Sequence, residues 1–397
     1  MAGSKGALDG VVILDLSRIL AGPTCTQLLG DLGATVWKIE NPDGGDDTRK
    51  WGPPFVSDAE GQPTDLSSYF LCANRNKQSI SLDMRSAEGQ KTLAALAARA
   101  DIVIENFKPG GLKKYGLDHE TLLARHPGLV YCSISGFGQT GPNRDKPGYD
   151  LMAQGYGGIM SLTGPVEGPP MKVAVGIADV MCGMYATVGI LAALRHRDKT
   201  GEGQHIDLAL VDAQMAWLIN EGTSYLTTGE VPQRRGNGHP NIVPYEVFPA
   251  KDGHVIIAVG NDAQFTRFCD AFGLDQLPQD PAYATNPMRL KNRADLIARL
   301  TPELLRHPMA EIIARLEARK VPVGPINDLH QVFTSDQAKA RDMVIEVEGP
   351  SGPMRLIGNP LKLSRTPVRY SKAPPRAGQD TETVLTQQGL SAAKPKT

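Results

Sequence analysis

The alternation of strand and helix signals along the first 220 residues is the feature that most limits how this chain can fold. Short apolar runs typical of buried strands alternate with longer segments of helical periodicity. This rhythm predicts a Rossmann-like α/β fold, in which helices cover both faces of a mainly parallel sheet and ligands bind beyond the carboxyl ends of the strands. The predicted strands are residues 11–16, 35–40, 79–83, 101–105 and 129–134, and the predicted helices include 24–33 and 87–100.

The sequence pattern changes near Gly229, which indicates a second domain. A polar loop over 234–240 is followed by predicted strands at 247–248 and 254–259, and by predicted helices at 262–272, 289–305 and 309–319. We therefore predict that residues 1–224 begin a large ligand-binding α/β domain, that 225–325 form a smaller inserted α+β domain, and that 326–397 return to the large domain. Residues 321–325 are interpreted as a linker, and the end of the chain from about Ser371 is expected to be mobile or to wrap a partner.

Composition excludes several classes of function. The net charge of −1 over 397 residues argues against nucleic acid or a membrane surface as a partner. The five scattered cysteines predict reduced thiols in a cytoplasmic protein, and the eight histidines lack metal-ligand spacing, so no metal site is expected. The N-terminus has no signal-peptide core, and no run of about 18 apolar residues predicts a membrane span.

Asp179 is a carboxylate in an apolar, glycine-flanked stretch, residues 173–184. A buried carboxylate is costly unless it is hydrogen-bonded, has a shifted pKa or is reactive. One interpretation is a nucleophile. The other is an N-cap for the helix predicted over 180–194, and a single residue could serve both roles.

Two further patterns leave alternatives open. The G-x-G-x-x-G sequence at 136–141 follows a strand, but prolines rather than a helix come after it. It therefore fits a loop that brings backbone close to a ligand better than it fits a dinucleotide fingerprint. Six basic residues near predicted strand ends form either a solvated face or a set of phosphate ligands. They are Lys38, Lys77, Arg85, Lys108, Lys113 and Lys114.

An ordered series of short blocks spans nearly the whole chain, at 8–10, 12–15, 21–23, 32–34, 38–40, 74–80, 105–110, 135–138, 148–150, 183–184 and 199–204, together with Gln27 and Asp179. With these blocks the sequence resembles the class III CoA-transferases, the group that includes formyl-CoA and carnitine CoA-transferases. The chain departs from the formyl-CoA transferase pattern at Leu20 and over 235–239.

The resemblance implies an enzyme built as an interlocked homodimer, with Asp179 as the catalytic carboxylate. It also implies that coenzyme A is a co-substrate, that no cofactor is permanently bound, and that acyl-CoA and a small carboxylic acid are the substrates. We expect CoA or its acyl group to be contacted by Ile19, Leu20, Ala21, Lys38, Leu82, Arg85, Asn106, Phe107, Lys114, Asp150, Gly236, Gly238 and His239.

In the reaction that the resemblance implies, Asp179 attacks the donor thioester, and the CoA thiolate then converts the resulting anhydride into an aspartyl-CoA thioester. Backbone N–H groups of the 236–239 loop could stabilise the oxyanions. Arg234 and Arg235 either point to solvent or pair the distal carboxylate of a dicarboxylic substrate, which favours succinyl-CoA or another small dicarboxylyl-CoA.

Two alternatives compete with CoA transfer. An α-methylacyl-CoA racemase-type enzyme would use an acid–base pair, but Tyr149 stands where such relatives tend to carry a histidine before Asp150. A non-catalytic CoA-binding protein would not need Asp179 in its glycine-flanked stretch.

Overall fold

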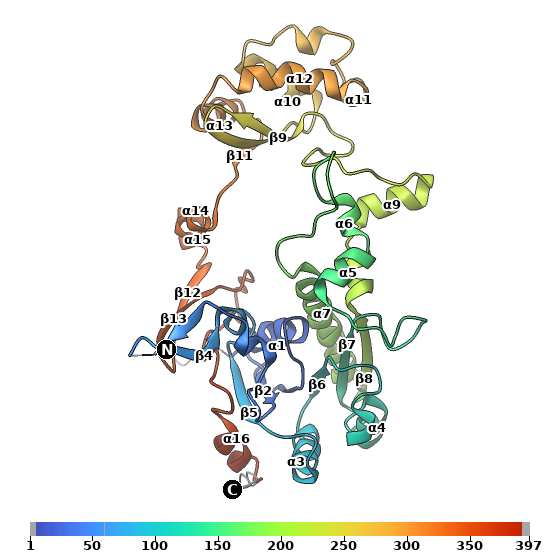
Figure 1. The fold of residues 1–397 in the computed structure, drawn as a ribbon, viewed down its shortest axis with the longest axis vertical. Helices are drawn as coiled ribbons and strands as arrows, with labels where there is room; N and C mark the ends of the chain where they lie inside the picture. Colours follow the sequence, from blue (N-terminus) through green and yellow to red (C-terminus); the bar gives the residue numbers. More distant parts are fainter. Residues whose placement is uncertain (1–4, 59, 391–397) are drawn as a thin grey trace. The chain divides into compact units, whose positions relative to one another are not determined.

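The computed structural model describes residues 5–58 and 60–390, which fold into two compact units (Figure 1). The first unit comprises Met1–Ile159, Lys172–Glu230 and Asp336–Thr397, and the second comprises Met160–Met171 and Val231–Ser335. Residues 160–171, expected in the large domain, thus belong to the second unit. Hydrogen bonds explain this placement, because the Arg234 guanidinium donates to the carbonyl oxygens of Pro165 and Gly168.

A six-stranded, wholly parallel sheet in the order β5-β2-β1-β6-β7-β8 forms the centre of the first unit. This confirms the α/β fold with a parallel sheet. The strands are β1 (Val12–Asp15), β2 (Thr35–Glu40), β5 (Lys77–Ser81), β6 (Ile102–Glu105), β7 (Val130–Ser135) and β8 (Gln204–Ala209). The chain runs from β1 to β2 on one side and reaches β6 on the other side. The loops that follow β1 and β6 therefore diverge, and such a switch point is where α/β sheets bind ligands.

Helices cover both faces of this sheet, as expected. On one face, α1 (Ala21–Asp31), α7 (Ile177–Thr200) and α8 (Leu210–Ala216) pack through buried side chains such as Cys25, Cys182 and Ile190. On the other face lie α3 (Ala87–Ala97), α4 (His119–Arg125) and α16 (Thr381–Gln387). In the described part of the chain, α7 has the length and mean hydropathy of a membrane-spanning helix, although residues such as Asp179 and Thr187 interrupt any continuous apolar run. Half of its most apolar window is buried, as in the core helix of a soluble protein.

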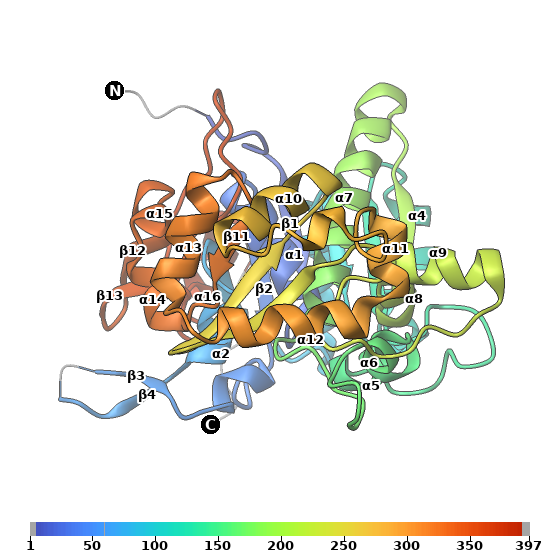
Figure 2. The same ribbon diagram turned by 90° about the horizontal axis from the view of Figure 1, so that it is seen from above.

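The second unit contains a three-stranded antiparallel sheet with helices beside it (Figure 2). Its elements are β9 (Tyr245–Ala250), β10 (Gly253–Ala258), β11 (Val323–Pro325), α10 (Asp262–Ala271), α11 (Asn286–Lys291), α12 (Arg293–Leu304), α13 (Met309–Ala318) and α14 (Leu329–Thr334). The predicted linker is partly a strand, since β11 pairs with β10. The single helix predicted over 289–305 is two helices that meet at Asn292.

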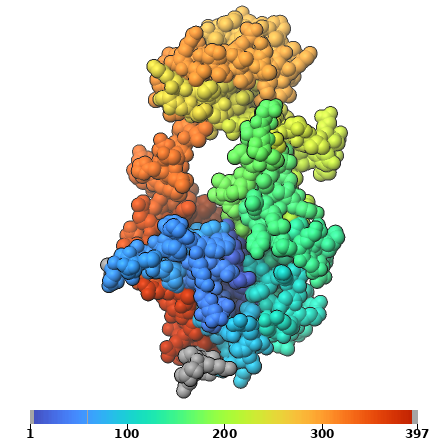
Figure 3. Space-filling model, in the orientation of Figure 1, coloured from blue at the N-terminus to red at the C-terminus, as the bar shows by residue number. Residues whose placement is uncertain are grey.

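The C-terminal segment returns to the first unit and docks on it, so the expectation of a mobile tail is wrong for residues 371–390. Ser371 N–H donates to the side chain of Asn76, Asp380 accepts the N–H of Ser79, and α16 buries Val384 and Leu385. The C-terminal red segment accordingly lies against the blue one in Figure 3. Residues 391–397 lie outside the described part.

The remaining elements of the first unit are short. They are β3 (Phe55–Ser57), β4 (Pro63–Ser67), α2 (Ser68–Leu71), α5 (Asp150–Tyr156), α9 (Ile219–Thr228), α15 (Asp336–Ala340), β12 (Val344–Gly349) and β13 (Gly352–Ile357). The short helix α6 (Ile159–Leu162) contains the sequence boundary, since Ile159 is assigned to the first unit and Met160 to the second.

Candidate active site

A pocket of about 290 Å³ opens at the switch point between β1 and β6. Its walls come from the loops after β1, β6 and β7 and from the starts of α5 and α7. Among the residues predicted from sequence, it brings together Ile19, Ala21, Asn106, Phe107, Asp150 and Asp179. Ser135 and Gly136 also line it, so the glycine-rich sequence at 136–141 begins at the pocket wall.

A second pocket of about 290 Å³ adjoins the first, and Arg18 and Phe107 line both. The Arg18 guanidinium lies 5.7 Å from the centre of the Phe107 ring, at the junction. This second pocket gathers the predicted residues Leu82, Arg85 and Lys114. Asn41 and Tyr115 line it as well and were not predicted. Asn41 had a usable signal, because it directly follows the carboxyl end of β2.

Asp179 lies in the first turn of α7, two residues after the first helical residue, Ile177. The N-cap position is occupied by Gly176, which makes no side-chain capping bond, so the N-cap interpretation of Asp179 is wrong. The cap comes from another helix instead. The Asp150 carboxylate accepts the N–H of Ala178 at 2.8 Å and that of Asp179 at 3.4 Å.

Asp179 is buried, with 9% of the residue exposed, and within residues 5–58 and 60–390 its carboxyl forms no ion pair. Burial raises its pKa to about 7, and the negative charge of Asp150 adds to the effect. The ionised form is therefore poorly solvated and held by no cation. A carboxylate in this state is a stronger nucleophile than a hydrated one.

Tyr69 is a neighbour of Asp179 that the sequence did not reveal. Burial raises the pKa of the Tyr69 phenol to about 12, and the charge of Asp179 is the next largest cause. The ring packs edge-on against Trp51, with 4.9 Å between the ring centres. The phenol thus stays protonated and can donate a hydrogen bond to a carboxylate.

Close backbone approaches explain why glycines surround the site. A Cβ atom on Gly136 would lie 2.4 Å from Cα of Gly148, and one on Gly183 would lie 2.6 Å from the carbonyl oxygen of Ala21. A Cβ atom on Gly176 would meet the side chain of Leu20 at 2.9 Å. Leu20, predicted to contact the ligand, is buried in this packing and is not among the residues that line the pocket.

Lys38 and Lys77 lie in the core and not at the pocket surface. The Lys38 ammonium donates to Asp46 at 2.8 Å and to the carbonyl oxygen of Ser17 at 3.1 Å, and the Lys77 ammonium pairs with Asp15 at 3.3 Å. Because all four charged side chains are fully buried, the expectation that Lys38 contacts CoA, or that Lys77 binds phosphate, is wrong.

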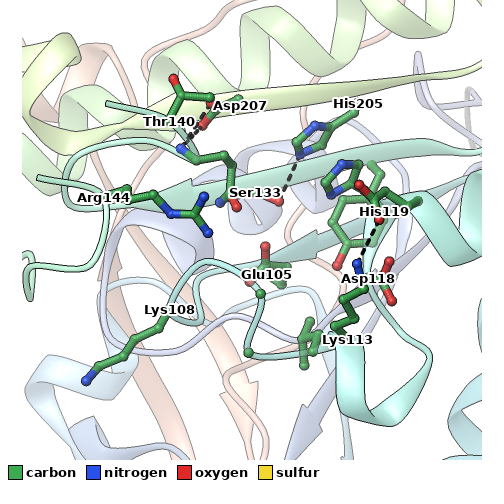
Figure 4. A pocket seen from close by; sticks show the side chains of 16 residues that line it. Glu105, Lys108, Lys113, Asp118, His119, Ser133, Thr140, Arg144, His205 and Asp207 are labelled. Carbon is green, nitrogen blue, oxygen red and sulfur yellow. Dashed lines mark hydrogen bonds and ion pairs between the residues drawn. The ribbon is translucent and has the colours of Figure 1, made fainter. Parts of the chain in front are cut away.

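A polar pocket of about 500 Å³ lies beside the carboxyl ends of β6, β7 and β8 (Figure 4). At its centre, burial raises the pKa of Glu105 to about 7, although its carboxylate accepts the N–H of Phe107 at 2.7 Å. The imidazole of His205 contacts the Ser133 hydroxyl at 3.0 Å and stacks on His119, with 3.7 Å between the ring centres. Glu105 thus connects this pocket to Phe107 of the adjacent pockets.

The predicted flap residues Gly236, Gly238 and His239 belong to the second unit. Gly236 adopts a φ of +58°, which favours glycine, and His239 stacks on Tyr245. The Arg234 guanidinium holds the carbonyl oxygens of Pro165 and Gly168. Its proposed pairing with a substrate carboxylate is therefore not supported, because these N–H groups already bind the protein.

Comparisons with known proteins identify the family of the chain. The model of the family described as CoA-transferase family III matches residues 8–381. The chain is 45% identical over 388 residues to the succinate–glutarate CoA-transferase of Agrobacterium fabrum, covering 98% of this chain and 97% of the relative. It is 39% identical over 391 residues to the succinyl-CoA:mesaconate CoA-transferase of Haloarcula marismortui, covering 97% of each.

A solved structure of a related protein has the same fold as this chain. The crystal structure of a CAIB/BAIF family protein from Brucella suis is 44% identical to this chain, and the two superpose with a TM-score of 0.86 over 97% of this chain and 100% of that one. With the family match over nearly the whole sequence, the chain belongs to CoA-transferase family III and is an enzyme of that class.

Proposed function

We propose that this enzyme transfers coenzyme A from succinyl-CoA, or another small dicarboxylyl-CoA, to a free dicarboxylic acid through an aspartyl-CoA thioester on Asp179. The observation that carries the proposal is the Asp179 carboxylate, which lines the pocket while buried and has no counter-ion among the described residues. The names of the relatives support the substrate class, since succinate, glutarate and mesaconate are all dicarboxylates.

The proposed reaction has two halves. Asp179 attacks the donor carbonyl carbon, the C–S bond breaks, and a mixed anhydride forms while CoA leaves as the thiolate. The thiolate then attacks the side-chain carbonyl carbon of Asp179, which frees the donor acid and leaves the aspartyl-CoA thioester. The acceptor carboxylate attacks this thioester and repeats the steps in reverse, so that Asp179 is regenerated as a carboxylate.

The two adjoining pockets support a division of roles among the residues. Leu82, Arg85 and Lys114 would hold the nucleotide end of CoA, because they line the pocket farther from Asp179. Ile19, Ala21, Asn106 and Phe107 would contact the thioester end. For Gly236, Gly238 and His239 the proposed role as a flap that stabilises oxyanions rests on the resemblance alone.

We also propose that the enzyme is an interlocked homodimer in the cytoplasm. Apolar side chains on α7 and α9 of the first unit are exposed, among them Val188 and Leu226. Exposed apolar patches of this kind mark surfaces that another chain covers, and a second copy is the commonest partner. Five cysteines without a disulfide suit a reducing compartment.

Incubation of the purified enzyme with succinyl-CoA and a panel of free acids tests the function. We expect acyl exchange with glutarate or mesaconate, and hydroxylamine added during turnover should trap a hydroxamate at Asp179. Deuterium incorporation at the α-carbon without exchange would instead support the racemase-type alternative. CoA binding without either reaction would support a binding protein.

A further inference from the structure

The loop between β1 and α1 has its main chain held by side chains from four other places in the sequence. Ser17 N–H donates to Asp15 at 2.9 Å, and the carbonyl oxygen of Ser17 accepts from Lys38 at 3.1 Å. The Asn106 amide accepts the N–H of Arg18 at 2.9 Å and donates to its carbonyl oxygen at 2.7 Å. The N–H of Ile19 donates to both carboxylate oxygens of Asp46 at 3.3 Å. Five successive polar atoms of the backbone are therefore fixed.

Ile19 is the strained residue at the end of this loop. Its φ of +72° lies in the left-handed region, which a β-branched residue rarely adopts. In the first βα loop of a nucleotide-binding α/β domain, glycine ordinarily makes such a backbone possible. Here the residue does not favour the conformation, so the conformation has to be imposed by the surrounding hydrogen bonds. Ile19 lines the same pocket as Asp179.

Asp46 and Lys38 are the innermost of these tethers. Both side chains are fully buried, and their charged atoms are 2.8 Å apart. Asp46 also accepts the N–H and the hydroxyl of Thr48, and its own N–H donates to Glu40 at 2.8 Å. These bonds fix the Asp46 carboxylate in position next to the N–H of Ile19. A buried ion pair is weak evidence of stabilisation by itself, because desolvation offsets much of the attraction.

We propose that the buried Lys38–Asp46 pair, together with Asn106, is a positioning device that holds Ile19 in its left-handed conformation and so sets the shape of the acyl pocket beside Asp179. Lys38 and Asp46 are then positioning residues, and Ile19 determines which acyl groups fit. This inference rests on the proposed function, because it concerns the pocket in which acyl transfer would occur.

A double-mutant cycle tests the device. Lys38→Met with Asp46→Leu removes both charges together and, with them, both oxygen acceptors of the Ile19 N–H. In the Ile19 background, this double variant should lower kcat/KM for the acceptor acid by about tenfold or more, and the Kd for CoA should change less than about threefold. In an Ile19→Gly background, where the backbone needs no tether, the same double variant should lower kcat/KM by less than about threefold.

A matched control is the equally buried Arg75–Asp31 pair in the same unit, at 2.6 Å and away from the pocket. Arg75→Met with Asp31→Leu, the same pair of changes, should lower the melting temperature without changing the kinetic constants. If the Lys38–Asp46 variant loses the same factor of kcat/KM in both Ile19 backgrounds, or loses none while folded, the inference is overturned.

Hydrogen exchange on the wild-type enzyme decides the question even if the double variant does not fold. The Ile19 amide should exchange slowly although it lies in a loop at a pocket wall, and exchange at the rate of an unprotected amide would overturn the inference. If the wild type transfers no CoA, the proposed function fails, whereas the exchange result still tests the tethers.

Discussion

Asp150 accepts the backbone N–H of Asp179 while its charge raises the pKa of the Asp179 carboxyl. One carboxylate thus caps the helix that presents the other and makes the ionised form of the other less stable. An N-terminal helix turn ordinarily stabilises a negative charge. At α7 the N–H groups of Ala178 and Asp179 donate to the Asp150 carboxylate, so they stabilise the charge of Asp150 and not that of Asp179. The proposed nucleophile therefore remains reactive despite its favourable place in the helix.

The pH dependence of the reaction should follow from this pair. Because Asp179 must be ionised to attack, kcat/KM should rise with pH through about 7, the pKa to which burial and Asp150 raise Asp179. Asp150→Asn keeps an acceptor for Ala178 but removes the repelling charge, so the acidic limb of the pH–rate profile should move to lower pH. A limb that stays in place would show that another group controls it.

Asp179→Asn should abolish CoA transfer and yet stabilise the fold at alkaline pH. The carboxyl has a folded-state pKa of about 7 against 3.8 for an ordinary aspartate, so the native state binds its proton more tightly than the unfolded state. That contribution to stability is present below about pH 4 and is lost as the pH rises to about 7. The asparagine loses nothing over this window, and its advantage at pH 8 is at most about 4 kcal/mol.

Urea unfolding of both proteins at pH 4 and pH 8 measures this difference. The free energy of unfolding of the variant, relative to wild type, should increase between the two pH values. Glu105 titrates in the same range but is present in both proteins, so its contribution cancels. An equal difference at both pH values would contradict the prediction.

Glu105 should affect CoA binding through the N–H of Phe107. Glu105→Gln keeps an acceptor for the N–H of Phe107, so the Kd for CoA should change less than about threefold. Glu105→Ala leaves that N–H unpaired, at a cost of about 1–3 kcal/mol to the folded pocket, and should therefore raise the Kd for CoA. Calorimetric titration with CoA compares the two variants. Equal affinities would show that the bond to Phe107 does not shape the pocket.

The packing of α7 against the segment that contains Ala21 should depend on Gly183 and not on Gly189, a second glycine of the same helix. A Cβ atom on Gly183 meets the backbone oxygen of Ala21 at 2.6 Å, so Gly183→Ala should cost about 1–3 kcal/mol. Gly189→Ala is the matched control, since its Cβ would lie 3.5 Å from Ile206 and alanine favours the helix by up to about 1 kcal/mol. Thermal unfolding distinguishes them, and equal melting temperatures would refute the packing argument.

The local sequence pattern predicts an element correctly where burial of apolar residues alone determines its structure. Residues 35–40 were predicted as a strand and are one, because apolar and β-branched residues dominate them. β8 was missed because Gln204–Ala209 contains His205 and Asp207, which line the polar pocket of Figure 4 and interrupt the apolar run.

Partners distant in sequence account for the other differences. The sequence predicts a start for α7 that is three residues too late, because the cap of the helix is Asp150 and no local residue signals it. The sequence predicts Lys38 as a ligand of CoA because it is a basic residue near a predicted strand end, where phosphate could bind. Only the fold reveals Asp46 opposite its ammonium group. Tyr69 lies on α2, far in sequence from Asp179, and no motif marked it.

The docking of the C-terminal segment on β5 has a consequence for how the chain is made. β5 is an edge strand of the six-stranded sheet, and residues 371–381 occupy its exposed side, where Asp380 accepts the N–H of Ser79 and the Thr381 hydroxyl accepts that of Ser81. An uncovered edge of this kind is a template for pairing with other chains. During synthesis the ribosome releases β5 some 300 residues before its cover emerges. A nascent chain therefore carries an aggregation-prone edge while some 300 of its 397 residues are made, and chaperones would have to protect it until the C-terminal segment arrives.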